Sequence, residues 1–297
     1  MSESGGPFFQ RFRRTAVLGV ILAAALLFCL ASVSRSQIPQ PFSSLKKRLV
    51  ADGFDAKSIE AIYADPRVKE DVQMVRVFFK YREARLDYGQ FTTPPAIRKA
   101  KAYMQRHKVS LDAVEQRYGV DKTVIAAILL VETRLGASVG KRSVLNTLST
   151  LAALSDAVVR DAFFKAVSRK VSVDPEKFKE WAQKKSKWAY KELTAFLRYT
   201  SREEMDPVSV PGSFAGALGI AQFMPTSILA YAEDGNEDGR VDLFDHADAA
   251  ASIASYLKGF GWRPGIDRQR ASKIIFRYNR SRYYVDTVLK ISALLKG

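Results

Sequence analysis

Residues 121–136 read DKTVIAAILLVETRLG, and this stretch decides the fold. Its apolar residues recur at the spacing of an α-helix. Asp121 is a residue type that caps the amino end of a helix, and Gly136 is one that follows the carboxyl end. The stretch therefore predicts a strongly apolar helix over 123–135.

Glu132 is the residue of this helix that points to chemistry. Three apolar side chains precede it on the same helical face: Ile125, Ile128 and Leu129. A carboxylate among apolar neighbours has its charged form destabilised and its pKa raised, which suits a general acid near neutral pH. An ion pair of Glu132 with Arg134 or Lys141 at the edge of the apolar stripe is the alternative, and periodicity alone favours that alternative.

The composition restricts the chemistry that the chain can perform. In 297 residues, Lys and Arg number 47 against 31 Asp and Glu, a formal net charge of +16 that attracts polyanions. The only histidines are His107 and His246, and the only cysteine is Cys29. A Cys/His zinc site and a disulfide framework are therefore excluded. In an enzyme of this composition, proton transfer falls to carboxylates.

The first 36 residues form a targeting segment. Arg11, Arg13 and Arg14 precede the run 16–33, which is almost wholly apolar. This run is longer than the core of a common signal peptide and slightly shorter than a spanning helix. We expect either a cleaved signal peptide or a membrane anchor. Both place the body of the protein in the periplasm or cell envelope.

The rest of the chain has a helical pattern. We expect an N-terminal helical region over 37–119 and a second domain over 120–297. Strand alternation is scarce, so the fold class is mainly α. An amphipathic, charge-rich stretch covers 165–192 and continues as a helical pattern to 198, and 207–219 is a loop. The other expected helices are 71–81, 95–107, 111–118, 144–154, 226–231, 247–260 and 281–295.

An acidic loop begins at residue 234 and reads DGNEDGRVDLFD. Asp234, Asn236 and Asp238 stand at positions 1, 3 and 5 of an EF-hand-like calcium pattern, followed by a glycine at position 6. Position 12 is Asp245, whose side chain is shorter than the usual Glu. Asp248, three residues on, is a second candidate to close the site. The alternative is an acidic surface turn.

Residues 212–225 read GSFAGALGIAQFMP, a tight loop entering a helix. Alone it is a weak signal, although Ser213 and Gln222 supply hydrogen-bonding groups. The motifs ETRxG from 132, GK from 140, this loop, the acidic loop, GW at 261 and YN at 278 occur in one order. This order resembles the lytic murein transglycosylase B family over roughly residues 45–297.

The resemblance implies a lysozyme-like helical core over 120–297 with Glu132 as the catalytic acid/base. Positions that line the sugar cleft are Arg160, Ser213, Gln222, Tyr256, Tyr278 and Asn279. It also implies a structural calcium ion in a loop over 234–248, longer than the standard one. Its ligands are Asp234, Asn236, Asp238, the Arg240 carbonyl and Asp248. The chain departs from the family at Leu135, where an aromatic residue is common, at Val159 beside Arg160, and in the basic stretch 165–192.

The implied reaction cleaves the β-1,4 bond between N-acetylmuramic acid and N-acetylglucosamine without water and leaves 1,6-anhydro ends. The implied partner is the peptidoglycan glycan strand. Nucleic acid is not expected, because no nucleic-acid motif is visible and the export segment separates the chain from chromosomal DNA. A hydrolytic muramidase and a non-catalytic peptidoglycan-binding scaffold remain as alternatives.

Overall fold

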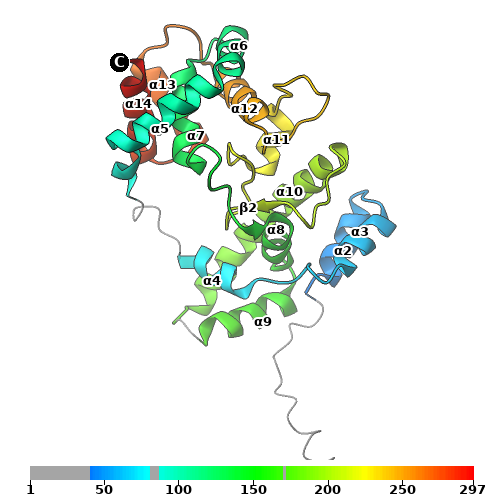
Figure 1. The fold of residues 1–297 in the computed structure, drawn as a ribbon. Coiled ribbons are helices and arrows are strands. Elements are labelled where there is room, and N and C mark those ends of the chain that lie inside the picture. Colours follow the sequence, from blue (N-terminus) through cyan, green and yellow to red (C-terminus); the bar gives the residue numbers. More distant parts are fainter. Residues whose placement is uncertain (1–40, 81–86, 170–171) are drawn as a thin grey trace, which may run out of the picture. The chain divides into compact units, whose positions relative to one another are not determined.

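The computed structural model describes residues 41–80, 87–169 and 172–297 (Figure 1). These residues are mainly helical, which confirms the predicted fold class. The α-helices are α2 (Ser43–Ala51), α3 (Ala56–Ala64), α4 (Val72–Lys80), α5 (Pro94–Arg106), α6 (Lys108–Tyr118), α7 (Lys122–Thr133), α8 (Val144–Ala153), α9 (Ala157–Ser168), α10 (Pro175–Arg202), α11 (Pro225–Tyr231), α12 (His246–Gly259), α13 (Arg268–Tyr278) and α14 (Arg282–Lys296). A 3₁₀ turn, η2 (Tyr88–Thr92), precedes α5. The sequence did not predict α9, α13 or η2.

Helix α7 lies in the core, as its apolar sequence predicts. It packs against α5 and α14 (Figure 1). Every residue of α7 is buried except Lys122 and Glu132. Two details of the prediction were wrong. The helix ends at Thr133 instead of residue 135, and Asp121 occupies the N-cap position without a side-chain capping bond. The Asp121 carboxylate instead accepts a hydrogen bond from Lys296 at 2.9 Å.

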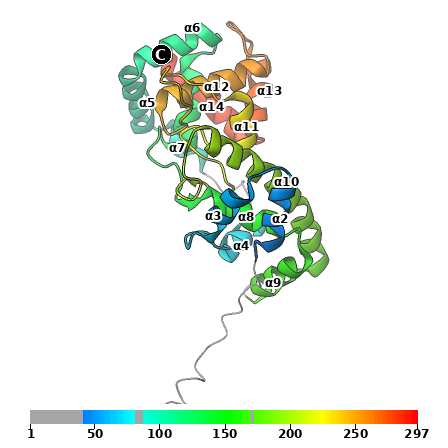
Figure 2. The same ribbon diagram turned by 90° about the vertical axis from the view of Figure 1, so that its right-hand side faces the viewer.

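Helices α8 and α10 form a second packed pair, visible in both views (Figures 1 and 2). The charge-rich stretch 165–192 is interrupted, because α9 ends at Ser168 and α10 begins at Pro175. Asp174 caps α10 by accepting a hydrogen bond from the Lys177 N–H, and proline at the first helical position fixes the start. The pair Asp174-Pro175 therefore marks the start of α10 within this stretch.

The strands of the described residues are two short segments, β1 (Arg142–Ser143) and β2 (Pro211–Gly212), which pair antiparallel. Their approach depends on Gly140, whose φ is +94°. A Cβ at this position would lie 2.1 Å from the Gly212 carbonyl oxygen, so no larger residue fits. The strand pair therefore joins the chain that follows α7 to the loop that carries Ser213.

Helices on both sides of residue 119 contact one another. Helix α5 packs on α7, α6 on α12, and α2 and α4 on α8. The division into 37–119 and 120–297 stays a prediction. The targeting role of residues 1–36 also stays a prediction, because these residues lie outside the described ranges. Among the helices of the described ranges, none is both long and apolar enough to cross a membrane.

Candidate active site

Glu132 lies one residue before the carboxyl end of α7 and is partly exposed, in contrast to its buried neighbours. The Tyr284 hydroxyl donates a hydrogen bond of 2.7 Å to Glu132 Oε1. Tyr284 belongs to the first turn of α14, where the Ser281 side chain accepts a hydrogen bond from its N–H. The packing of α14 on α7 therefore delivers a donor to the predicted catalytic carboxylate.

Tyrosine rings surround this hydrogen bond. The Tyr278 and Tyr284 rings stack with centroids 6.3 Å apart and an angle of 9° between their planes. The Tyr88 ring meets Tyr284 edge-on at 6.5 Å. Burial and the negative charge of Glu132 raise the pKa of Tyr278 and of Tyr284 well above the usual value of a phenol. Both phenols therefore remain protonated hydrogen-bond donors at neutral pH.

The end of α7 is held by the loop that follows β2. Arg134, Leu135 and Gly136 all have positive φ, at 52°, 63° and 88°, so the chain turns sharply after Thr133. The Thr133 hydroxyl donates to the Ile220 carbonyl at 2.9 Å and accepts from the Gly136 N–H at 2.9 Å. This turn leaves Glu132 at the rim of the core, and the hydrogen bonds of the adjacent Thr133 hold the end of the helix in place.

Ser213 and Gln222 lie on that same loop. The Ser213 hydroxyl accepts hydrogen bonds from two backbone N–H groups, those of Ala215 and Ala217. Gln222 has a positive φ of 50°, and its Nε2 donates to the Val139 carbonyl at 3.1 Å and to the Gly219 carbonyl at 2.9 Å. Both residues therefore order the loop, whether or not they also contact a ligand.

Tyr278 connects the loop to the tyrosine cluster, because its hydroxyl donates to the Ala221 carbonyl at 2.5 Å. Tyr256 is 8% exposed and packs edge-on against Tyr278 at 5.1 Å. Its hydroxyl donates to the Arg277 carbonyl at 2.8 Å, so Tyr256 supports the Tyr278 ring. Asn279 follows α13 in an extended conformation, and its carbonyl accepts from the Ser281 N–H.

Arg160 is placed differently from the other predicted site residues. It lies on α9, which packs on α4 and α10. Its guanidinium donates to the carbonyl groups of Leu154 and Ser155 at 3.3 and 3.4 Å. The structure thus brings Glu132 and Tyr278 together through Tyr284 and gives Arg160 a role in ordering the end of α8.

The acidic loop folds over its own backbone amides. Asp234 accepts hydrogen bonds from the N–H groups of Asp238 and Gly239, and Asn236 Oδ1 accepts from the same Asp238 N–H. Asp238 in turn accepts from the Arg240 N–H at 2.9 Å. The Asp238 N–H thus brings together the side-chain oxygens of positions 1 and 3, and the Asn236 amide donates to the carboxylate at position 5.

Asp248 braces this loop. It is 1% exposed, and its two carboxylate oxygens accept from the Gly235 and Asp242 N–H groups at 2.8 and 2.7 Å. Asp245 caps α12, as expected for a residue that does not close the metal site. Within the described ranges, no three Asp, Glu, His or Cys side chains form a metal-binding group.

Sequence reasoning missed Tyr284, which donates to Glu132, and Tyr88, whose ring packs against Tyr284. Tyr284 lies three residues after the N-cap Ser281, on the face of α14 that is buried, so its burial could be predicted from the sequence. Its partner could not be predicted, because 152 residues separate Tyr284 from Glu132.

Comparison of this chain with known proteins supports the predicted lysozyme-like helical fold. Residues 37–273 match the profile of the transglycosylase SLT domain family, and the chain belongs to that family. The membrane-bound lytic murein transglycosylase B of Escherichia coli (strain K12) is 33% identical over 176 residues, which are 59% of this chain. The aligned segment spans 41% of that relative's length.

Two solved structures share the fold. The Escherichia coli lytic transglycosylase SLT35, solved in complex with calcium, matches with a TM-score of 0.69 at 22% identity, over 86% of this chain and 93% of that one. SltB3 from Pseudomonas aeruginosa, solved in complex with NAG-NAM-pentapeptide, matches with a TM-score of 0.69 at 22% identity, over 88% and 80% of the two chains.

Proposed function

We propose that this chain is a lytic transglycosylase, which cleaves the β-1,4 bond between N-acetylmuramic acid and N-acetylglucosamine and leaves 1,6-anhydro ends. The observation that carries the proposal is the carboxylate of Glu132, which is partly exposed and accepts a hydrogen bond from Tyr284. Glu132 is the carboxylate whose charge acts on both Tyr278 and Tyr284. Ordinary glycosidases place a second carboxylate across the bond, as base or nucleophile.

One carboxyl group can serve both halves of such a reaction. Protonated Glu132 donates its proton to the bridging oxygen while the bond from that oxygen to muramoyl C1 breaks. The resulting carboxylate then takes the proton of the muramoyl C6 hydroxyl, whose oxygen bonds to C1. Glu132 ends the cycle protonated, and no water is consumed. Tyr284 holds one oxygen of the group throughout, which keeps the carboxyl orientation constant between the two steps.

The mass of the products tests this proposal. Purified peptidoglycan digested by the chain should release fragments with anhydro ends, one water lighter than fragments with reducing ends. Reducing ends as the sole product would identify a hydrolytic muramidase. Binding to sacculi without release of soluble fragments would identify a scaffold.

We further propose a structural calcium ion in the loop 234–248, held by Asp234, Asn236, Asp238 and the Arg240 carbonyl, with Asp248 bracing or closing the loop. Support comes from the shared amide donors that gather these oxygens. The Asp248 carboxylate accepts from the backbone N–H groups of Gly235 and Asp242, and the lone-pair capacity that its oxygens retain would be available to the ion. Calcium would offset repulsion among the carboxylates and lies outside the proton-transfer steps.

Calcium should raise the melting temperature, by an amount that corresponds to about 2.7 kcal/mol at a hundredfold excess over its dissociation constant. Magnesium should raise it less, because it demands stricter geometry and resists dehydration. Asp238→Ala should abolish the calcium response and Glu237→Ala should keep it, since Glu237 stands between the ligand positions. Identical melting curves in chelator and in excess calcium would contradict the site.

We also propose that residues 1–36 direct the chain to the cell envelope as a signal peptide or a membrane anchor. The basic flank and the apolar run 16–33 support this proposal. Protease added to spheroplasts should digest the body of the chain, and intact protein after such treatment would contradict export. Release by high salt distinguishes a cleaved signal from an anchor.

A further inference from the structure

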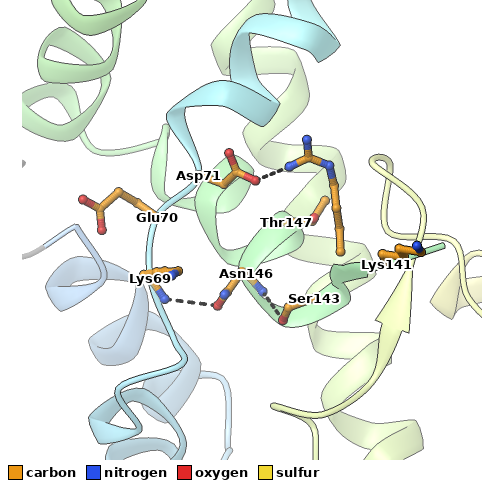
Figure 3. Close-up of a pocket in the computed structure, with 8 residues that line it drawn as sticks. Lys69, Glu70, Asp71, Lys141, Ser143, Asn146 and Thr147 are labelled. Atoms are coloured by element: carbon orange, nitrogen blue, oxygen red, sulfur yellow. Dashed lines mark hydrogen bonds and ion pairs between the residues drawn. The ribbon is translucent and has the colours of Figure 1, made fainter.

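A cavity of about 380 Å³ lies between the segment that precedes α4 and the amino end of α8 (Figure 3). Residues of both segments and of β1 line it: Lys69, Asp71, Lys141, Arg142, Asn146 and Thr147. It contains neither Glu132 nor its tyrosines. The cavity is therefore a separate site from the one described above.

The walls of this cavity are held in place by hydrogen bonds. Asn146 Oδ1 accepts from the Lys69 N–H at 3.2 Å, and its Nδ2 donates to the Arg67 carbonyl at 2.8 Å. On the opposite side, Arg142 forms an ion pair with Asp71 (Figure 3). The Asp71 N–H also donates to a buried threonine of α8. The cavity thus has fixed walls before any ligand binds.

Thr147 provides an unused polar group at the base of the cavity. Its residue is 1% exposed and lines the cavity, and within the described ranges its hydroxyl makes no hydrogen bond. The hydroxyl is not one of the fully buried polar atoms that lack a partner, so it is open to the cavity, where a ligand can form a hydrogen bond with it. Thr147 also stands in the first turns of α8, whose amino end carries a partial positive charge.

The charges around the cavity favour an anion. Arg142 and Asp71 neutralise each other, which leaves the ammonium groups of Lys69 and Lys141 against the carboxylate of Glu70. Both lysines are exposed, and neither forms an ion pair within the described ranges. The Glu70 side chain extends away from Asn146 in Figure 3. A hydroxyl, a helix amino end and two ammonium groups together suit a carboxylate.

We propose that this cavity is a subsite for a carboxylate of the peptide that hangs from the glycan strand. The inference rests on the proposed function, since peptidoglycan carries acidic peptides on its muramic acid residues. The path of the chain supports it: Lys141 directly precedes β1, which pairs with β2, and Ser213 follows β2. A strand bound along the Ser213 loop would hold its peptide close to the cavity.

Binding of matched glycan fragments, with their peptides and after enzymatic removal of the peptides, tests this subsite. Every variant is made in the Glu132→Gln background so that no substrate is consumed. Lys141→Met should weaken binding of peptide-bearing fragments about tenfold, and Thr147→Val, which keeps the shape but removes the hydroxyl, about fivefold. Binding of the peptide-free fragments should not change. Lys99→Met, the loss of an equally exposed charge on α5, is the control and should leave both affinities unchanged.

Equal weakening for both fragments, or no weakening for the peptide-bearing one, overturns the subsite. Inorganic phosphate is the second arm. If the cavity binds only a small free anion, phosphate should raise the melting temperature of the parent but not of Thr147→Val, and the substitutions should affect binding of the two kinds of fragment equally. This result would also overturn the assignment to the peptide. The melting temperature of Thr147→Val without phosphate checks its fold. The subsite is tested by binding affinity and the proposed function by the release of anhydro products. The failure of one proposal can therefore be distinguished from the failure of the other.

Discussion

Glu132 and Glu192 are two glutamates on core helices with opposite surroundings. Glu192, on α10, is 5% exposed, and its oxygens accept hydrogen bonds of 2.9 Å from the N–H and the hydroxyl of Thr226. Thr226 stands in the first turn of α11, whose N-cap residue Met224 makes no side-chain capping bond. Glu192 therefore supplies from a neighbouring helix the cap that α11 lacks.

Glu132 is partly exposed and accepts a hydrogen bond from the phenol of Tyr284. A carboxylate whose oxygens are committed to an amide and a hydroxyl stabilises a fold and has little freedom to exchange a proton. A partly exposed carboxylate beside phenol donors keeps that freedom. The comparison teaches that the burial of a carboxylate and its hydrogen-bond partners together distinguish the structural role of Glu192 from the catalytic role proposed for Glu132.

The largest expected effect tests the catalytic half of this comparison. Glu132→Gln should lower the release of soluble glycan fragments by about 10²–10⁴-fold, because the amide cannot transfer the proton. Its melting temperature should stay close to that of the parent, since Tyr284 can donate to the amide oxygen. Half of the parental activity in this variant would place the acid elsewhere.

Glu192→Ala tests the structural half. It leaves the Thr226 N–H and hydroxyl without their partner inside the protein, which should cost about 2 kcal/mol of folding free energy. The loss is measured by denaturant unfolding, with Glu180→Ala, an exposed change on the same helix, as the control. Activity per folded molecule should be retained, and a selective loss of activity would break the comparison.

Tyr284→Phe sharpens the comparison by changing only the partner of Glu132. The ring contacts with Tyr278 and Tyr88 are kept, while the hydrogen bond to the carboxyl group is lost. We expect kcat to fall about tenfold, the effect of one hydrogen bond to a charged group. Tyr283→Phe is the matched control, because Tyr283 is 67% exposed. Equal rates for the two variants would remove Tyr284 from the site.

The smallest expected effect is a pH dependence that comes from Tyr256, whose ring packs against Tyr278 beside Glu132. Burial raises the pKa of Tyr256 to about 12, from about 10 in an unfolded chain. The folded state therefore favours the neutral phenol, and this contribution to stability is complete below pH 10 and is lost as the pH rises toward 12. Melting temperatures between pH 9 and 12 should fall less steeply for Tyr256→Phe, and parallel curves would contradict this.

The sequence predicted the parts of this molecule that depend on local order. The apolar period of residues 121–136 located α7 and Glu132, and the spacing of the acidic loop located its folded turn. Contacts between distant segments were not predictable. Periodicity did not show that Lys296 would take the Asp121 carboxylate, or that Tyr284 would meet Glu132, because these pairs form only when α14 packs on α7. Glu192 ends the stretch that the sequence described only as charge-rich and amphipathic. Its contact with Thr226 was likewise not predictable, because it forms only when α11 packs on α10.

The double donation by Gln222 limits what this residue can recognise. Its Nε2 is committed to the carbonyl groups of Val139 and Gly219, so its amide can offer a ligand only the oxygen, as an acceptor. A sugar hydroxyl or an acetamido N–H satisfies that oxygen, whereas a carbonyl or carboxylate repels it. In the proposed function, the Gln222 oxygen would therefore bind hydrogen-bond donors of the sugar, whereas the lysine-lined cavity would bind acceptors of the peptide.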